Sequence, residues 1–348
     1  MYSRTGIKPK KLEKGDTLAV LSPSWGGPAA YPHIFDQGLK VLKEEFGFRI
    51  VEYPTARMSA ATLYANPELR AADLNAAFKD PSVSGIICSI GGSDSVRILE
   101  HLDVPAILAN PKLIMGFSDS TSILCYLNLH GLVTYHGNSV MAGFSQLACF
   151  PDALAEYGRV LFSSGGYGLA PFGTWSNAYK DWNDPENVGK VDALLTADTG
   201  HRWIQKGLAA EGRLWGGCIE ILAMINGTLA WPGKDFWNDR ILFFETSEDK
   251  PTPEQVGYIL RNFGVQGILQ RLKGLLVAKP KDYSAEEKLA LDKEVLRVVA
   301  GEFNCRDIAI VTNIDFGHTD PRHIMPLGIQ TRIDPMQESI VFTEPLFS

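Results

Sequence analysis

Short apolar runs alternate along the first half of the chain with stretches whose apolar residues recur at helical spacing. The runs are bounded by Gly, Pro, Ser and Asp, which is typical of buried strands. We expect strands at residues 17–21, 48–53, 85–90 and 113–115. We expect helices at residues 31–46, 67–78 (capped by Asn66) and 95–102, and another after residue 120. This alternation predicts βαβ units and therefore an α/β fold built on a parallel sheet.

Three polar loops follow predicted strands of this sheet. They cover residues 22–28, 91–94 and 117–120, and the first two contain paired glycines. In an open parallel sheet, ligands bind beyond the carboxyl ends of the strands, which lie at one edge. The positions of these loops therefore predict a binding site at that edge.

The alternation of strand-like and helix-like patterns is lost in the middle of the chain and resumes near Gly207. Residues 162–200 are rich in Gly, Ser, Pro, Asn and Asp, which indicates a connector with a short hairpin. Beyond it we expect helices at 218–226, 252–263 and 285–300, and strands at 240–244, 275–278 and 308–312. Thr252 and Gln255 have the spacing of a helix capping box. We predict an N-terminal α/β domain (1–160), a connector (161–206) and a smaller C-terminal α/β domain (207–348) that completes the active site.

Composition narrows the class of protein. The 348 residues are 45% hydrophobic and 21% charged, as in ordinary globular proteins, and the length favours two domains. The formal charge of -7 argues against nucleic-acid or anionic-membrane partners. The five cysteines lack C-x-x-C spacing, which favours free thiols in a reducing compartment. With no signal peptide or membrane-spanning run expected, the predicted location is the cytoplasm.

Residues 113–124 carry the strongest chemical signal. A short apolar strand runs into Gly-Phe-Ser-Asp-Ser at 116–120, and a helix follows. This resembles the G-x-S-x-G nucleophile elbow, with Ser120 in place of the second glycine. The turn would expose the Oγ of Ser118 beside helix N–H groups that can stabilise an oxyanion. The alternative is that Ser118, Asp119 and Ser120 only cap the helix.

A serine nucleophile needs a base and a group that orients the base. We rank His318 first, because it lies in a Gly- and Pro-flanked turn after an apolar strand, and His136 second. Glu245 ends a buried strand, where a carboxylate is rare unless it is paired or functional. A salt bridge or emergence into solvent is the alternative for Glu245. Glu248 and its neighbour Asp249 are expected to be exposed.

We expect neither a metal nor a cofactor. The chain has no H-E-x-x-H motif, and its histidines at 318 and 323 have the wrong spacing for one. The glycine loops match neither the dinucleotide nor the P-loop pattern.

Several stretches resemble the LD-carboxypeptidase family of serine peptidases. They are S-I-G-G-S-D-S at 89–95, G-F-S-D at 116–119, L-F-F-E at 242–245, and D-F-G-H-T-D-P at 315–321 with P-L-G at 326–328. The G-G-C-I-E stretch at 216–220 favours the microcin C immunity branch of that family. The resemblance spans nearly the whole chain.

The resemblance implies a Ser118–Glu245–His318 triad, an oxyanion hole made by the amides of Gly92 and Asp119, and a homodimer. In this branch an aromatic residue of the connecting loop stacks on the substrate's nucleobase. Trp182 is the first candidate and Trp175 the second, and both can instead be hydrophobic anchors of the loop. Ser93 is a further candidate for substrate contact.

Three functions follow as expectations. The first is a hydrolase that cleaves the amide bond of small aminoacyl- or peptidyl-nucleotide conjugates such as processed microcin C. The second is an LD-carboxypeptidase that removes the terminal D-alanine of murein tetrapeptides. Such an enzyme usually uses an arginine for the carboxylate, and Arg97 is the candidate. The third is a non-catalytic binding module at the same sheet edge.

Overall fold

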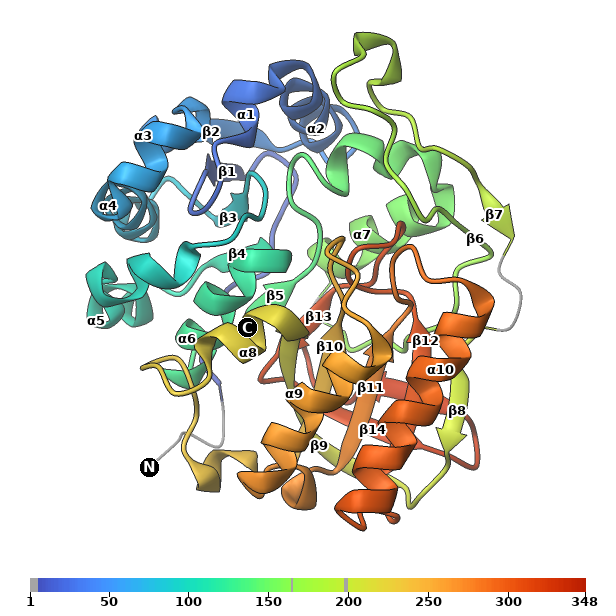
Figure 1. Cartoon of the computed structure of the whole chain (residues 1–348). Coiled ribbons are helices and arrows are strands. Elements are labelled where there is room, and N and C mark those ends of the chain that lie inside the picture. Colours follow the sequence, from blue (N-terminus) through green and yellow to red (C-terminus); the bar gives the residue numbers. More distant parts are fainter. Residues whose placement is uncertain (1–5, 164, 197–199) are drawn as a thin grey trace.

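The computed structural model describes residues 6–163, 165–196 and 200–348. Two large sheets dominate it, one formed mainly by the first half of the chain and the other by the second half (Figure 1). The expected α/β fold is confirmed. None of the helices in the described ranges is both long and apolar enough to cross a membrane.

The first sheet has the strand order β13-β5-β4-β3-β1-β2. Its strands are parallel except for β13, which is antiparallel to β5. Ala19, Ile86 and Ile114 lie side by side on three neighbouring strands, and none of them is exposed. The strands are β1 (Thr17–Leu21), β2 (Arg49–Glu52), β3 (Gly85–Cys88), β4 (Leu113–Gly116), β5 (Thr134–His136) and β13 (Met325–Leu327).

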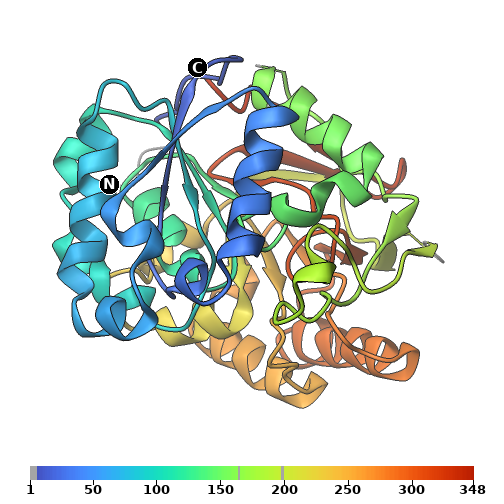
Figure 2. The ribbon, with the colours of Figure 1, turned by 90° about the horizontal axis from the view of Figure 1, so that it is seen from above.

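Helices cover both faces of the first sheet, and this accounts for the continuous apolar runs in its strands (Figure 2). They are α1 (Gly27–Ala30), α2 (Pro32–Glu44), α3 (Ala60–Ala65), α4 (Pro67–Lys79), α5 (Val104–Ala109), α6 (Thr121–Leu129) and α7 (Pro151–Phe162).

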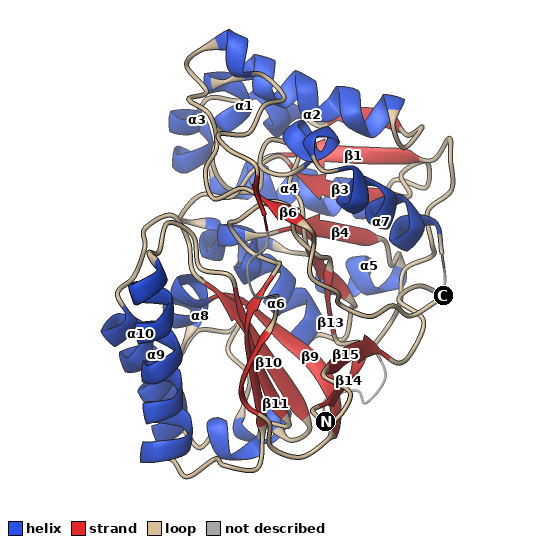
Figure 3. Ribbon diagram, turned by 90° about the vertical axis from the view of Figure 1, so that its right-hand side faces the viewer, coloured by secondary structure: helices blue, strands red, loops and turns tan. Residues whose placement is uncertain are grey.

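The second sheet has the order β15-β14-β9-β10-β11-β12-β8, with a parallel centre from β9 to β12 and antiparallel strands outside it. Helices α9 and α10 lie together beside it (Figure 3). Its strands are β8 (Arg202–Gln205), β9 (Ala210–Cys218), β10 (Arg240–Glu245), β11 (Gly274–Ala278), β12 (Ala309–Ile314), β14 (Gln330–Asp334) and β15 (Ser339–Phe342). Its helices are α8 (Ile219–Ile225), α9 (Pro253–Val265) and α10 (Ala285–Leu296).

In the connector, β6 (Thr174–Trp175) and β7 (Leu195–Thr196) pair antiparallel, but residues 176–194 separate them, so the expected hairpin has short strands and a long loop. The capping box of Thr252 and Gln255 is present at the start of α9. Strand β13 joins the first sheet, although the chain has by then built most of the second one. The two sheets are thereby linked directly by the segment that follows β12.

Three local expectations need correction. The helix expected at 95–102 is a 3₁₀ helix (Ser95–His101), because its N–H groups bond three residues back, as in Leu102 N to Leu99 O. The long helix expected at 285–300 ends at Leu296 and continues as a π-helical segment (Arg297–Glu302). Asn66 does not cap α4 with its side chain, because that amide donates to Thr62 O at the end of α3.

Candidate active site

The three loops predicted to converge do so at the carboxyl edge of the first sheet. Trp25 N donates to Gly91 O, and a side chain at Gly91 would collide with the Cβ of Ser118. A cavity of about 480 Å³ opens beside them, and it is also lined by residues of the connector and of the loops that follow strands of the second sheet. Its wall includes Gly92, Ser118, Trp182, Glu248 and His318.

Ser118 stands on the turn between β4 and α6. Its φ of 59° lies in the left-handed region, which costs a residue with a side chain about 1–2 kcal/mol. The preceding strand is fully buried and the following helix is packed on all sides, so the surrounding fold holds this conformation. The hydroxyl is thereby presented to the cavity.

His318 bridges Ser118 and Glu245. Its Nε2 lies 3.2 Å from Ser118 Oγ, and its Nδ1 donates to Glu245 Oε2 at 2.6 Å. Gly317 has a φ of 88° and packs against the Glu245 side chain so closely that a Cβ there would collide with it. A glycine is therefore required at 317 for the histidine turn to approach the end of β10.

Burial and charge together set the protonation of this pair. Burial alone would lower the pKa of His318, but the carboxylates of Glu245 and Glu248 raise it to about 9. Burial would raise the pKa of Glu245, but His318 and His136 bring it to about 2. Glu245 is 1% exposed, so its charge is little screened by solvent. The arrangement stabilises a protonated imidazole beside an ionised carboxylate.

Glu248 also contacts the histidine, which the sequence did not indicate. Its Oε2 lies 2.9 Å from His318 Nε2, although its side chain is 63% exposed, as expected. This contact lowers the pKa of Glu248. The Nε2 atom therefore has two neighbours, Ser118 Oγ and a carboxylate.

His136, the second-ranked base, lies on the far side of Glu245. Its Nε2 is 3.6 Å from Glu245 Oε1, and neither of its ring nitrogens forms a hydrogen bond with a described residue. It is fully buried and packs edge-on against Phe117 and Phe243. Burial lowers its pKa, against the opposing effect of the Glu245 carboxylate. It has no contact with Ser118 comparable to that of His318.

Gly92 and Ser118 line the cavity, and Asp119 follows Ser118 directly on the elbow. The N–H groups of Gly92 and Asp119 donate no hydrogen bond to another of the described residues. The Asp119 carboxylate accepts from Ser95 N at 2.8 Å, from Asp94 N at 3.1 Å and from Ser24 Oγ. It thereby joins the elbow to the other two loops.

The two connector tryptophans lie in different places. Trp182 lines the cavity, where its ring contacts Tyr31 and Tyr179 at centroid distances of 5.6 and 5.8 Å. Trp175 is outside it, with Lys279 Nζ 4.6 Å from its ring centroid. Of these two tryptophans, Trp182 is thus the one positioned beside the cavity.

The other two residues predicted to contact the substrate, Ser93 and Arg97, also differ in their position relative to the cavity. Ser93 lines the cavity. Arg97 faces away: its guanidinium donates to Tyr64 O and to Asp94, and it is not part of the cavity wall. Its side chain is instead part of the contact between the 3₁₀ helix and α3.

Sequence reasoning missed some of the wall. Trp25, Tyr179 and Lys281 line the cavity, but none was singled out. Two of them could have been found from their position in the sequence, because Trp25 lies in a loop expected at the sheet edge and Tyr179 lies in the aromatic connector. No local pattern marks Lys281, which reaches the site from the loop after β11.

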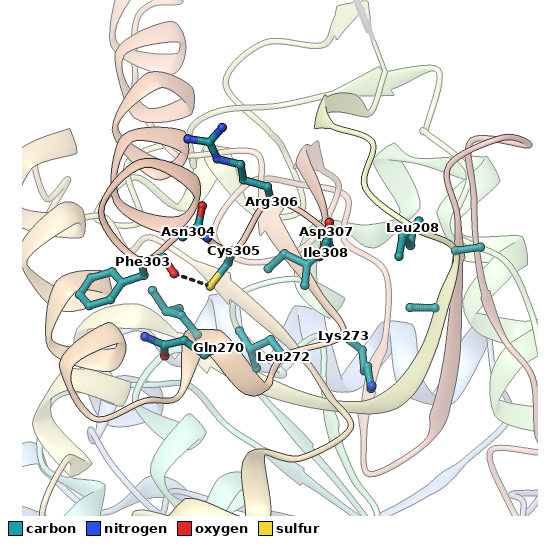
Figure 4. Close-up of a pocket in the computed structure, with 13 residues that line it drawn as sticks. Leu208, Gln270, Leu272, Lys273, Phe303, Asn304, Cys305, Arg306, Asp307 and Ile308 are labelled. Carbon is teal, nitrogen blue, oxygen red and sulfur yellow. Dashed lines mark hydrogen bonds between the residues drawn. The ribbon is translucent and has the colours of Figure 1, made fainter.

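A second cavity of about 550 Å³ lies near the amino ends of β11 and β12 (Figure 4). Its wall includes Lys273, Phe303, Cys305 and Arg306. Cys305 Sγ donates to Phe303 O, and burial raises the pKa of this thiol, so it is not an activated nucleophile. The described residues contain no group of three or more His, Cys, Asp or Glu side chains arranged to hold a metal ion.

Comparison with known proteins gives consistent matches. The LD-carboxypeptidase N-terminal domain matches residues 18–137, and the LD-carboxypeptidase C-terminal domain matches residues 211–333. A putative carboxypeptidase of Streptomyces coelicolor is 34% identical over 346 residues, which are 97% of each chain. The microcin C7 self-immunity protein MccF of Escherichia coli is 26% identical over 347 residues, covering 97% of this chain and 96% of the relative.

A solved structure matches along the whole fold. The microcin C7 self-immunity protein MccF in complex with aspartyl sulfamoyl adenosine is 25% identical and has a TM-score of 0.85. The match covers 98% of this chain and 100% of the other. The similarity thus extends over both sheets and the connector.

Proposed function

We propose, from the premise that the chain belongs to the LD-carboxypeptidase family and is a serine peptidase-like hydrolase, that Ser118, His318 and Glu245 are its catalytic triad. We further propose that it cleaves the amide bond of aminoacyl-nucleotide conjugates. The observation that carries the triad is the continuous contact from Ser118 Oγ through His318 to Glu245. The family assignment also removes the third expectation, a non-catalytic binding module.

The chemistry follows from this contact. His318 Nε2, once unprotonated, takes the hydroxyl proton of Ser118 as Oγ attacks the acyl carbon. Glu245 accepts from Nδ1, fixes the tautomer and stabilises the imidazolium that forms. The imidazolium then gives its proton to the leaving nitrogen, and the acyl group stays on Oγ as an ester. Water, deprotonated by His318, attacks this ester; the bond to Oγ breaks, the acid leaves, and the imidazolium returns the proton to Oγ, which restores Ser118.

The oxyanion formed at each step lies beside the amides of Gly92 and Asp119. Both N–H groups are unpaired among the described residues, and they belong to loops that the Asp119 carboxylate holds together. Donors fixed before the reaction need no reorganisation, and each contributes roughly 3 kcal/mol in comparable sites.

The cavity supports a nucleotide conjugate as the substrate. About 480 Å³ is within the range of small-molecule sites, and Trp182 offers an aromatic ring in its wall. Stacking on such a ring suits a nucleobase. The solved relative bound to aspartyl sulfamoyl adenosine supports this class of substrate.

Removal of D-alanine from a murein tetrapeptide is the second candidate. A carboxypeptidase activity in general is supported by the Streptomyces coelicolor relative, which is named a putative carboxypeptidase and has a higher sequence identity (34%) than the immunity protein (26%). A terminal carboxylate needs a cation in the site. Arg97 is outside the cavity, whereas Lys180 and Lys281 line it.

One experiment separates these candidates. The purified protein and its Ser118→Ala variant are incubated with aspartyl sulfamoyl adenosine or with a murein tetrapeptide, and products are identified by mass spectrometry. Release of aspartate and the nucleoside sulfamate by the wild type alone supports the proposal. Loss of D-alanine alone supports the carboxypeptidase. Equal turnover by Ser118→Ala refutes the triad. The homodimer and the cytoplasmic location stay predictions, for which size-exclusion chromatography and cell fractionation are the direct tests.

A further inference from the structure

The catalytic histidine has a carboxylate on each ring nitrogen. Glu245 Oε2 is 2.6 Å from Nδ1, and Glu248 Oε2 is 2.9 Å from Nε2. An ionised carboxylate can only accept a hydrogen bond, so both contacts together require an N–H on each nitrogen. That form is the imidazolium, which has no lone pair for a proton of Ser118. The contact with Glu248 therefore occupies the atom that must act as the base.

The loop that carries Glu248 is anchored, but its carboxylate is not. Ser247 N and Oγ donate to Glu220 Oε1 at 2.9 and 2.6 Å, and Asp249 N donates to Ser247 Oγ. These bonds hold the backbone on both sides of Glu248. The Glu248 side chain is 63% exposed, and His318 is its one side-chain partner among the described residues. It can therefore swing away while the loop stays in place.

The other charges of the cavity do not neutralise Glu248. Lys281 Nζ donates to Asn177 O at 2.7 Å and lies 3.4 Å from Asp282. Lys180 is paired with Asp192 at 3.4 Å. Both lysines thus have partners of their own.

Asp249 contributes further negative charge to the cavity wall near Glu248. It lines the same cavity, and its carboxylate has no hydrogen-bond or ion-pair partner within the described ranges. The cavity wall therefore carries two carboxylates, Glu248, which contacts only His318, and Asp249, which has no partner among the described residues.

We propose that Glu248 selects substrates by the charge of the acyl group. An aminoacyl group brings an ammonium one carbon from the scissile carbonyl, and this cation draws the Glu248 carboxylate from Nε2. Without that acceptor Nε2 releases its proton to solvent and can act as the base. A carboxylate on the acyl side chain is repelled by Glu248 and competes for the same ammonium. The enzyme thus prefers neutral and basic aminoacyl groups to acidic ones. This inference rests on the proposed function, because it concerns the acyl part of the same substrate.

An isosteric pair of substrates tests the charge alone. Asparaginyl and aspartyl sulfamoyl adenosine differ only by an amide against a carboxylate, and kcat/KM is measured for both by release of the nucleoside sulfamate. We expect the wild type to favour the asparaginyl conjugate by about tenfold or more, as for two like charges a few ångströms apart. Glu248→Gln should reduce this preference to within about threefold. Glu254→Gln, an exposed residue at the start of α9, is the matched control and should keep the wild-type ratio.

Binding separates the failure of this inference from failure of the proposed function. Dissociation constants for both conjugates are measured by calorimetry with Ser118→Ala and with Ser118→Ala/Glu248→Gln. A charge preference in binding that Glu248→Gln removes supports the inference even if neither conjugate is hydrolysed, in which case only the proposed function fails. The inference is overturned by equal or better use of the aspartyl conjugate, by a ratio that Glu248→Gln does not change, or by the binding of neither conjugate.

Discussion

Replacing Glu245 by glutamine removes one charge and preserves the shape of the side chain. The carboxylate lies 2.6 Å from His318 Nδ1, and both residues are almost fully buried. The amide can turn its NH₂ or its oxygen toward Nδ1. When the NH₂ faces the ring, Nδ1 becomes an acceptor and the proton moves to Nε2, which is the wrong tautomer for a base.

The size of the effect follows from the lost Coulomb energy. Two unit charges about 4 Å apart interact with roughly 4 kcal/mol at an effective dielectric constant of about 20. Since about 1.4 kcal/mol corresponds to a tenfold change in rate, kcat should fall by roughly 10³-fold, with KM little changed. The same loss of charge lowers the pKa of His318, which Glu245 and Glu248 raise to about 9 against the effect of burial.

The assay is a pH profile of kcat/KM, from about pH 5 to about pH 10, with a conjugate that the wild type hydrolyses. The base must be unprotonated, so activity of the wild type should rise with pH up to the pKa of His318. In Glu245→Gln this rise should occur at lower pH, although Glu248 still faces Nε2 and His136 stays nearby. Circular dichroism controls for folding. A loss smaller than about tenfold together with an unmoved pH limb would refute the assigned role of Glu245.

Four further outcomes follow. Ser118→Ala should lose at least about 10³-fold in kcat while keeping its fold and its affinity for ligand, as measured by calorimetry; normal turnover would exclude Ser118 as the nucleophile. Gly92→Ala should lower kcat more than affinity, because a Cβ there would collide with Ser24 Oγ and displace the oxyanion amide; unchanged kcat would argue against this amide. Trp182→Ala should raise KM for a nucleotide conjugate by about tenfold through lost stacking and leave a murein tetrapeptide unaffected, and an equal effect on both would remove its assignment to the nucleobase. Because the pKa of Glu245 is lowered from 4.5 to about 2, its ionised form contributes about 3 kcal/mol above pH 4.5, and this is lost as the pH falls toward 2. Urea unfolding of the wild type should show this loss, whereas Glu245→Gln should not.

Much of the fold can be read from local sequence. The apolar runs at β1, β3 and β4 report burial on both faces of a sheet, and the spacing of Thr252 and Gln255 reports a helix start. These features depend only on residues that are close in sequence, so they can be recognised without knowledge of the rest of the chain. The elbow at Ser118 belongs to the same group, because strand, turn and helix are contiguous.

The candidate site depends on contacts that no local pattern contains. His318 lies 73 residues from Glu245 and 200 residues from Ser118 along the chain. The pairing of β10, β11 and β12 in the second sheet closes the first gap, and the packing of the two sheets closes the second. Spacing could not distinguish Trp182 from Trp175, because both lie in a connector whose path is set by what it packs against.

The same limit applies to Glu248, whose exposure the sequence predicted but whose contact it did not. By itself the sequence determined the α/β class, most of the elements and the residue types available for catalysis. The tertiary structure decided which of these residues meet, because contacts between distant residues arise from how whole elements pack and not from the period of any one of them.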